Sequence, residues 1–432
     1  MKRASLVALV ALAAARDARG DATVAESTEQ LANGLRLIVA PDPTASAVAV
    51  YVSYRFGTGD DDRGGGLYAH VLERVLAGGG PRARARHVDL TLDAIGGWSS
   101  SSTTADRVAT VDVVPPGALA YALWLEADRM SVGPAGITND EVERELAAIQ
   151  TERSAAYDQT PVALVERAIA DELWRGGEYE ANRRNALAPL GDRRADFARP
   201  LALKVIEPSN ATIVIAGAVT SADVRRLVAR YFAGLPSADA FVRAPAPPVV
   251  PLRGGIPVAT ARDATTRVVL AARAPRDTAE LWIAAQLLAA GKRGRLVAAM
   301  VDPGLALEVH ARIEPRAIGS ELVVEAVVKP GADPDAVRAA IVAELVAIGT
   351  EPSDPGELEV AKAGAEADRI RALESLAFRA SALATWAEPT NPWHSRIAER
   401  DALRAVTPES LRAAGAMWLN ANAIVSVIGH PP

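Results

Sequence analysis

The chain has no cysteine among its 432 residues. Disulfide bonds, thiol catalysis and a lipid-modified N-terminal cysteine are therefore excluded. Lysine and arginine are scattered along the chain rather than gathered in one stretch, and the formal net charge is only −6. Because nucleic-acid binding requires a concentrated basic surface, we expect no nucleic-acid partner. Half of the residues are hydrophobic and 23% are charged, which is typical of a globular protein.

The sequence also lacks a hydrophobic run long enough to cross a membrane. The clearest candidate is at the N-terminus, where Lys2 and Arg3 precede a largely apolar run of twelve residues from Ala4 to Ala15. Such a run rises only about 18 Å as a helix, which is short of the ~30 Å hydrocarbon core. The order of basic, apolar and small residues is typical of a secretory signal peptide. We therefore predict a signal peptide over residues 1–20, no membrane span after its cleavage, and a periplasmic or secreted location. An uncleaved anchor is the alternative.

Two stretches of the sequence repeat one pattern about half a chain apart. Residues 210–217 (NATIVIAG) and 422–429 (NAIVSVIG) each begin with Asn-Ala, continue with β-branched residues and end at glycine. Each stretch predicts a buried strand that ends in a turn. The repeat indicates two copies of one domain. We expect these halves at residues 21–236 and 253–432, joined by an extended, proline-rich linker at 237–252.

Strand and helix patterns alternate in the first half without a regular strand-helix-strand rhythm. Alternating or β-branched residues predict strands at 35–39, 48–54 and 108–114. Helices are expected at 67–77, 118–130 and 140–158. The fold class is therefore expected to be α+β.

The helix expected between two glycine triplets carries a candidate chemical motif, in which His70 and Arg74 enclose Glu73. Residues four apart lie on one face of a helix. A zinc peptidase of the inverted type has His-x-x-Glu-His here, with two histidines on the metal and the glutamate beside a water. Arg74 stands where the second histidine belongs, and arginine offers only donors. An ordinary polar helix face remains the alternative.

A second pair of polar residues lies on the helix expected at 140–158, which begins at a capping-box pattern from Thr138 to Glu141. Glu145 and Glu152 are two turns apart, on a face beside the apolar stripe. A zinc site with two histidines on one helix needs a third ligand from another element, and a carboxylate is suitable. A solvated, charged helix face is the alternative interpretation, because arginines surround both residues.

Taken in order along the chain, several stretches resemble the insulinase/pitrilysin family of zinc metallopeptidases, of the two-half bacterial type with a degenerate motif. The resemblance covers nearly the whole mature chain. It implies two homologous halves like α/β sandwiches, each with a mixed, mostly antiparallel sheet covered by helices. The stretches that carry it are residues 31–39 (LANGLRLIV), 57–59 (GTG), His70 to Arg74, 96–107 (GGWSSSSTTADR), 125–130 (LEADRM), 207–211 (EPSNA) and 231–236 (YFAGLP).

Residue by residue, the resemblance implies roles for several positions. His70 falls on the first zinc ligand, Glu73 on the general base and Arg74 on the second ligand, which is lost. Glu152 falls on the third ligand, one residue beyond the family's usual spacing, and Glu145 falls on an accessory carboxylate. The substrate-binding edge strand covers Ser99, Ser100, Ser101 and Ser102, with Ser100-Ser101 where the family usually has Asn-Ala. In the second half, Met300 and Leu307 occupy positions where active relatives have an arginine and a tyrosine that contact substrate.

These departures weaken the expectation of independent catalysis. Zinc, if it binds at all, is expected to be held weakly or to be absent, because one of three protein ligands is missing. One hypothesis places the Arg74 guanidinium in the vacated cation position, paired with Glu73 or Glu152. The other lets Arg74 turn to solvent while another group completes the metal site.

Three functions remain open from the sequence. The first is a non-catalytic or weakly catalytic subunit that binds extended peptides along the edge strand. This subunit would pair with an intact peptidase paralogue, or form a homodimer. The second is a working zinc metalloendopeptidase with an altered ligand set. The third is a scaffold that keeps only the fold, as the family's core subunits of respiratory complexes do.

Overall fold

The computed structural model describes residues 26–61, 67–84, 88–159, 195–237, 241–243, 259–260, 265–274 and 278–430, and also 165, 168–169 and 172–174. The predicted signal peptide at 1–20 lies outside these residues, as does most of the predicted linker at 237–252. No helix in the described part of the chain is long and apolar enough to cross a membrane.

The chain forms two compact units, and each unit is built from three separate segments of the sequence. The first contains residues 1–147, 190–243 and 372–385, and the second contains 148–189, 244–371 and 386–432. A short stretch from late in the chain is thus part of the first unit. Arg379 in that stretch forms an ion pair with Asp42, whose carboxylate oxygen lies 2.7 Å from the guanidinium.

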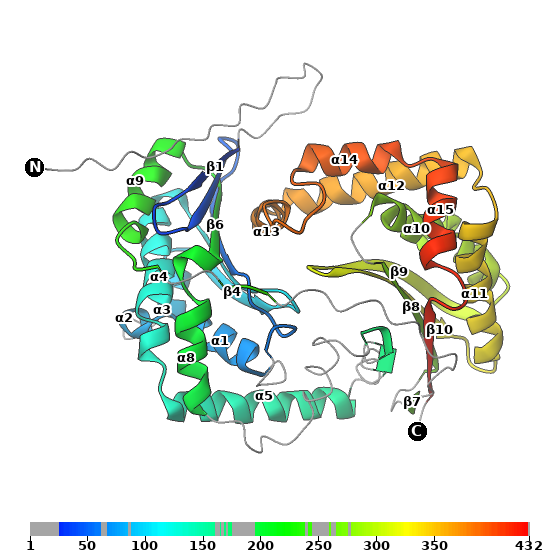
Figure 1. The fold of residues 1–432 in the computed structure, drawn as a ribbon, viewed down its shortest axis with the longest axis horizontal. Coiled ribbons are helices and arrows are strands. Elements are labelled where there is room, and N and C mark those ends of the chain that lie inside the picture. Colours follow the sequence, from blue (N-terminus) through cyan, green and yellow to red (C-terminus); the bar gives the residue numbers. More distant parts are fainter. Residues whose placement is uncertain are drawn as a thin grey trace, which may run out of the picture. The chain divides into compact units, whose positions relative to one another are not determined.

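The first unit is built on a six-stranded sheet in the order β1-β2-β6-β3-β5-β4. All neighbours are antiparallel except β2 and β6. Helices α1, α4 and α9 contact its strands (Figure 1). Its elements are β1 (Ser27–Gln30), β2 (Arg36–Pro41), β3 (Val48–Tyr54), α1 (Leu67–Ala77), α2 (Pro81–Arg84), α3 (Val88–Ala94), β4 (Trp98–Thr103), β5 (Val108–Val114), α4 (Leu119–Ser131), the first part of α5 (Asn139–Gln159), α8 (Ala198–Val205), β6 (Ala211–Gly217), α9 (Ser221–Phe232) and most of α13 (Leu376–Trp386).

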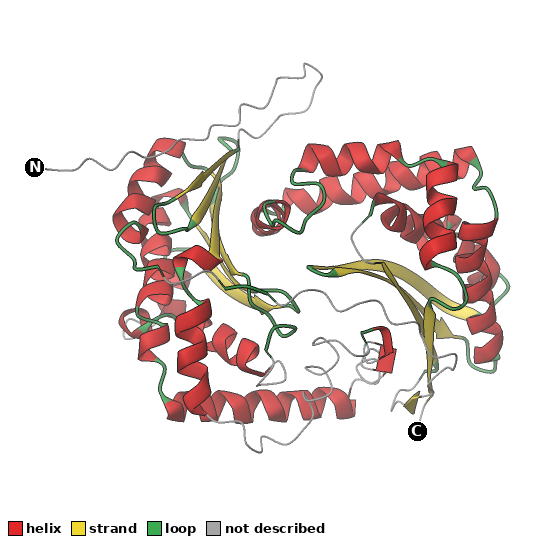
Figure 2. Cartoon of the chain, viewed as in Figure 1, coloured by secondary structure: helices red, strands yellow, loops and turns green. Residues whose placement is uncertain are grey.

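The second unit is built on a five-stranded sheet in the order β7-β11-β8-β10-β9. Here β7 and β11 are parallel and the other neighbours antiparallel. Figure 2 shows its strands and helices in different colours. The elements are β7 (Ala259–Thr260), β8 (Arg267–Ala274), α10 (Ala279–Ala289), the π-helical turn η6 (Val297–Val301), β9 (Ala306–Arg316), β10 (Gly319–Val328), α11 (Pro334–Thr350), α12 (Pro355–Glu374), α14 (Arg396–Ala405), α15 (Pro408–Trp418) and β11 (Ile424–His430).

The two sheets share one topology, which confirms two related halves. The order β2-β6-β3-β5-β4 of the first corresponds strand for strand to β7-β11-β8-β10-β9 of the second. In each sheet the last strand in sequence lies between the first and second of these five, parallel to the first. The repeated sequence pattern falls on β6 and β11, the two corresponding last strands. The α+β class with mixed, mostly antiparallel sheets is therefore confirmed.

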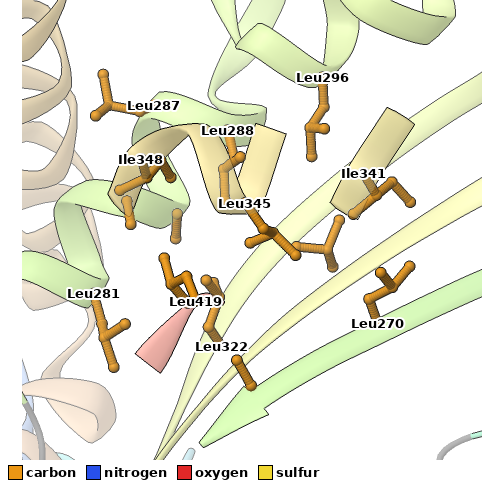
Figure 3. Packing of buried hydrophobic residues seen from close by; sticks show 14 of the residues in the cluster. Leu270, Leu281, Leu287, Leu288, Leu296, Leu322, Ile341, Leu345, Ile348 and Leu419 are labelled. Atoms are coloured by element: carbon orange, nitrogen blue, oxygen red, sulfur yellow. The ribbon is translucent and has the colours of Figure 1, made fainter. Parts of the chain in front are cut away.

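The core of the second unit lies on one face of its sheet. Alternate residues of a strand point to opposite faces, and Leu322 and Val324 of β10 belong to the buried cluster while Glu321 and Glu325 do not. Figure 3 shows Leu322 and Leu270 from the strands among leucine and isoleucine side chains of the helices. The opposite face therefore carries the charged residues of this sheet.

Candidate functional site

The helix that carries the metal-motif positions is held at both ends by buried charged groups. At its N-terminal end, the Asp61 carboxylate accepts hydrogen bonds from the Tyr68 and Ala69 amides at 2.7 and 3.3 Å. At its C-terminal end, Arg129 donates from Nε to the Leu76 carbonyl at 2.9 Å. Negative charge at the N-terminus and positive charge at the C-terminus both favour the helix dipole. The frame of the motif is therefore intact although the motif itself is altered.

The internal packing of α1 explains which residues it presents on its polar face. Leu67, Val71 and Val75 recur at four-residue intervals and are buried, as expected for an amphipathic helix. His70, Glu73 and Arg74 occupy the remaining face and are only partly exposed. The predicted helix at 67–77 is thus confirmed, and His70 and Arg74 lie one turn apart on it.

Glu73, the general-base position, is engaged by the neighbouring edge strand. Its two carboxylate oxygens accept hydrogen bonds from Ser101 Oγ at 3.0 Å and from Thr103 Oγ1 at 2.5 Å. His70 Nδ1 lies 3.6 Å from Glu73 Oε2. Partial burial raises the pKa of Glu73, but the hydrogen bonds from His70, Thr103 and Ser101 outweigh it and hold the pKa below its usual value. The glutamate is therefore an ionised, hydrogen-bonded carboxylate.

The predicted edge strand is β4, which lies at one edge of the first sheet. Its side chains alternate: Ser99 and Ser101 are partly buried, whereas Ser100 and Ser102 are exposed. Ser99 accepts a hydrogen bond from Arg129 Nη2 at 3.1 Å, and Ser101 donates to Glu73. The inward hydroxyls thus fasten β4 to charged side chains of the helices, while the outward ones face solvent.

Arg74 pairs with Glu145, the residue predicted as an accessory carboxylate, across 3.5 Å from Nη1 to Oε2. Both side chains are about one third exposed, at 34% and 30%. Glu145 and Glu152 lie two turns apart on α5, as expected, and the first unit ends between them, at residue 147. At the start of α5 the Thr138 hydroxyl accepts a hydrogen bond from the Glu141 amide at 3.2 Å, as the predicted cap requires.

The residues at this place do not fit the zinc site that the resemblance implies. Such a site needs a second neutral imidazole at residue 74, and Arg74 is instead a permanent cation paired with a carboxylate. Within the described ranges, no group of three or more histidine, aspartate or glutamate residues is arranged to hold a metal ion. The side chains present here can hold and orient a ligand through hydrogen bonds and charge.

The two positions predicted as lost substrate contacts lie in different environments. Met300, in η6, has no exposed surface and belongs to the hydrophobic core of the second unit. Leu307, on the edge strand β9, is 52% exposed. Only Leu307 therefore offers a side chain to solvent in this structure.

Sequence reasoning did not assign a role to the buried residues that organise the site. Asp61, Asp112, Glu126 and Arg129 are all ionisable and buried. A signal was available, because Asp112 interrupts the apolar run of β5, and Glu126 and Arg129 lie in a helix that is otherwise mostly apolar. Their partners come from other elements, which the sequence pattern alone does not reveal.

Parts of the chain are similar in sequence to known proteins. The sequence profile described as "Peptidase M16 inactive domain" matches residues 202–365. The chain is 27% identical over 291 residues to coenzyme PQQ synthesis protein F of Pseudomonas aeruginosa, covering 66% of this chain and 37% of that protein. It is 24% identical over 236 residues to the zinc protease PqqE of Helicobacter pylori, covering 54% and 52%. The matches thus span about a third to a half of these relatives.

Solved structures are similar over nearly the whole chain. A protease from Helicobacter pylori has a TM-score of 0.82 at 20% identity, with 94% of this chain and 99% of that chain covered. A putative M16-like peptidase from Alicyclobacillus acidocaldarius has a TM-score of 0.81 at 17% identity, with 95% and 99% covered. The periplasmic protease PqqL from Escherichia coli has a TM-score of 0.72 at 16% identity, with 94% and 48% covered. At these identities the likeness shows the fold.

Proposed function

Because this chain belongs to the insulinase/pitrilysin family of metallopeptidases, we propose that it is a non-catalytic or weakly catalytic peptide-binding subunit. It binds extended peptides along β4 and pairs with an intact peptidase paralogue. It holds zinc weakly or not at all, and it acts in the periplasm or outside the cell. A relative of similar fold, PqqL, is described as a periplasmic protease.

The observation that carries the proposal is the engagement of Glu73. A general base must be free to take a proton from water, and both Glu73 oxygens accept hydroxyl hydrogens from β4. One of these hydroxyls belongs to Ser101, at a position where the family usually has alanine. Ser101, which differs from the residue that the family usually has in the edge strand, therefore also hydrogen-bonds to the carboxylate at the general-base position, Glu73.

The state of Arg74 supports the same conclusion. Its guanidinium takes the place of an imidazole ligand and balances the charge of Glu145. An ion pair this exposed is worth only about 0–1 kcal/mol, so its importance is chemical rather than energetic. It puts a fixed positive charge where a catalytic site needs a metal ligand.

A comparison of two edge strands supports β4 as the place where a peptide adds. β9, at the edge of the second sheet, alternates charged residues on the face away from its core and includes Pro315, features that protect an edge from pairing. β4 (Trp98–Thr103) contains no charged residue and no proline. An extended peptide can therefore add to β4 through main-chain hydrogen bonds with little electrostatic opposition.

The proposal is tested with the purified protein and a fluorescent unstructured peptide of mixed sequence. We expect binding without cleavage, substoichiometric zinc in the protein as purified, and no effect of chelator on binding. Hydrolysis by the lone protein that is abolished by chelator and by Glu73→Gln would instead establish a working endopeptidase. Tight association with unrelated proteins and no peptide binding would favour a scaffold.

Two variants locate the peptide. Lysines at the exposed positions, in Ser100→Lys/Ser102→Lys, should weaken binding at least tenfold because charge on an edge strand opposes pairing. Thr390→Lys places one lysine at an exposed loop position and is the control, for which we expect unchanged affinity. Pairing is tested by adding an intact His-x-x-Glu-His family member and measuring complex formation by light scattering. A homodimer would appear without that addition.

A further inference from the structure

A fully buried cluster of ionisable residues, Arg129, Asp112 and Glu126, lies inside the first unit, next to the candidate site. Arg129 of α4 places Nη1 at 3.1 and 3.0 Å from the two carboxylate oxygens of Asp112 on β5. The same nitrogen lies 2.5 Å from Oε1 of Glu126, one turn earlier on α4. None of the three side chains has any exposed surface. Two carboxyl groups therefore share one cation in a place without solvent.

The Arg129 guanidinium also donates hydrogen bonds to α1 and β4, the two elements that carry the candidate site. Nε and Nη2 donate to the carbonyls of Leu76 and Ala77 at the end of α1, at 2.9 and 3.3 Å. Nη2 also donates to Ser99 of β4 at 3.1 Å. Arg129 thus links the helix of the metal-motif positions to the edge strand, and its position depends on the charge of the two carboxyl groups beside it.

If Glu126 ionised beside Asp112, few neighbouring groups could stabilise its negative charge. Thr110 of β5 donates to Oε1 of Glu126 at 2.8 Å, while the buried Oε2 has no hydrogen-bond partner among the described residues. The titratable and charged groups that face Glu126 are Asp112, Arg129 and the buried phenol of Tyr54 on β3. Burial, together with the neighbouring Asp112, raises the pKa of Glu126 to about 8 against the lowering effect of Arg129.

We propose that Glu126 keeps a proton that it shares with Asp112 in the folded protein at neutral pH, so that Arg129 is a pH-sensitive positioning residue for α1 and β4. When Glu126 ionises, its new negative charge competes with Ser99 and the helix carbonyls for the single guanidinium. The hold on β4 then loosens. The effect on peptide binding rests on the proposed function, whereas the shared proton and the loosening do not.

Three measurements on the full chain test the proposal. Infrared difference spectra of the wild type between pH 6 and pH 10 should contain the band of a buried, protonated carboxylic acid, which disappears on alkaline titration. The band should be absent in Glu126→Gln, whose amide reproduces the protonated acid. Hydrogen exchange at β4 and at the end of α1 should accelerate at least about fivefold beyond the intrinsic pH effect in the wild type alone. Peptide affinity should fall over the same range in the wild type alone.

Each outcome bears on the proposal. Glu359→Gln changes an exposed carboxylate of the second unit and should behave as the wild type. A wild-type spectrum without the acid band, or equal acceleration of exchange in wild type and Glu126→Gln, would overturn the proposal. If Glu126→Gln does not fold, the wild-type band and its titration still decide. If no peptide binds but the band and the exchange behave as stated, the proposed function fails and this inference stands.

Discussion

Ser101 donates a hydrogen bond to Glu73 across 3.0 Å, from the edge strand of the first sheet to the helix of the metal-motif positions. This contact joins two positions that are separate in the sequence: Ser101, where the resemblance implies alanine, and Glu73, where it implies the general base. It implies that restoring the metal ligand alone does not restore a free base.

The first prediction follows from this contact. Arg74→His completes the two-histidine pattern on α1 and should raise zinc affinity at least about tenfold, measured by competition with a chromophoric chelator. Peptide hydrolysis should remain near background, because Ser101 and Thr103 still occupy Glu73. The double variant Arg74→His/Ser101→Ala should hydrolyse peptide faster than Arg74→His.

The matched control for this series is Arg74→His/Ser102→Ala. Ser102 is the next residue of β4, and its side chain points to solvent. This control variant should hydrolyse peptide at the same rate as Arg74→His. A rate equal to that of the Ser101→Ala double variant would contradict the role assigned to the Ser101 hydroxyl.

The second prediction concerns acid stability. The pKa of Glu73 is lower in the folded protein than its usual value near 4.5. A depressed pKa contributes stability at pH values above the unfolded value, and that contribution is lost as pH falls through the folded value. Glu73→Gln should therefore remove part of the loss of stability below about pH 4.5, measured as denaturant midpoints from pH 7 to pH 3. Glu359→Gln, at an exposed ion pair, should keep the wild-type profile.

Particular residues show how much the sequence could predict. The strands at 48–54 and 108–114 and the helix at 67–77 match β3, β5 and α1 to the residue, because buried β-branched runs and four-residue apolar spacing are local signals. The repeated pattern at 210 and 422 correctly indicated related halves. The grouping of residues 372–385 with the first unit could not be predicted, because it depends on long-range contacts such as Arg379 with Asp42.

The candidate site was predictable only in part for the same reason. Spacing along one helix predicted that His70, Glu73 and Arg74 lie together. The serine run at residues 99–102 marked the edge strand that the family resemblance implies. The partner of Arg74 was expected to be Glu73 or Glu152, and the structure shows an ion pair between Arg74 and Glu145. The hydroxyl contacts of Glu73, and the bonds of Arg129 to α1 and β4, join residues 28 to 53 positions apart, and sequence spacing does not predict which residues pair over such separations.

The third prediction tests the frame of α1. Asp61→Ala removes the carboxylate that accepts the Tyr68 and Ala69 amides, and should lower the free energy of unfolding by about 1–2 kcal/mol. Hydrogen exchange at the start of α1 should accelerate, and peptide binding should weaken. Asp333→Ala removes a similar cap at α11 in the second unit. This control should cost comparable stability without changing exchange at α1, whereas equal exchange in both variants would show that Asp61 has no local effect.

The fourth prediction separates the two positions of the second half at which substrate contacts are expected to be lost. Met300 has no exposed surface, so Met300→Arg puts an unpaired charge into the core and should lower the free energy of unfolding by about 3 kcal/mol or more. Leu307 is 52% exposed on β9, so Leu307→Tyr should change it by less than about 0.5 kcal/mol. Urea unfolding followed by circular dichroism measures both. Met300→Leu, which keeps the volume and apolar character, should cost less than about 1.5 kcal/mol. A folded Met300→Arg variant of wild-type stability would mean that η6 can turn this side chain out of the core. In that case one substitution could restore the arginine that the resemblance implies at position 300.

The buried position of Met300 indicates instead that the core has adapted to methionine.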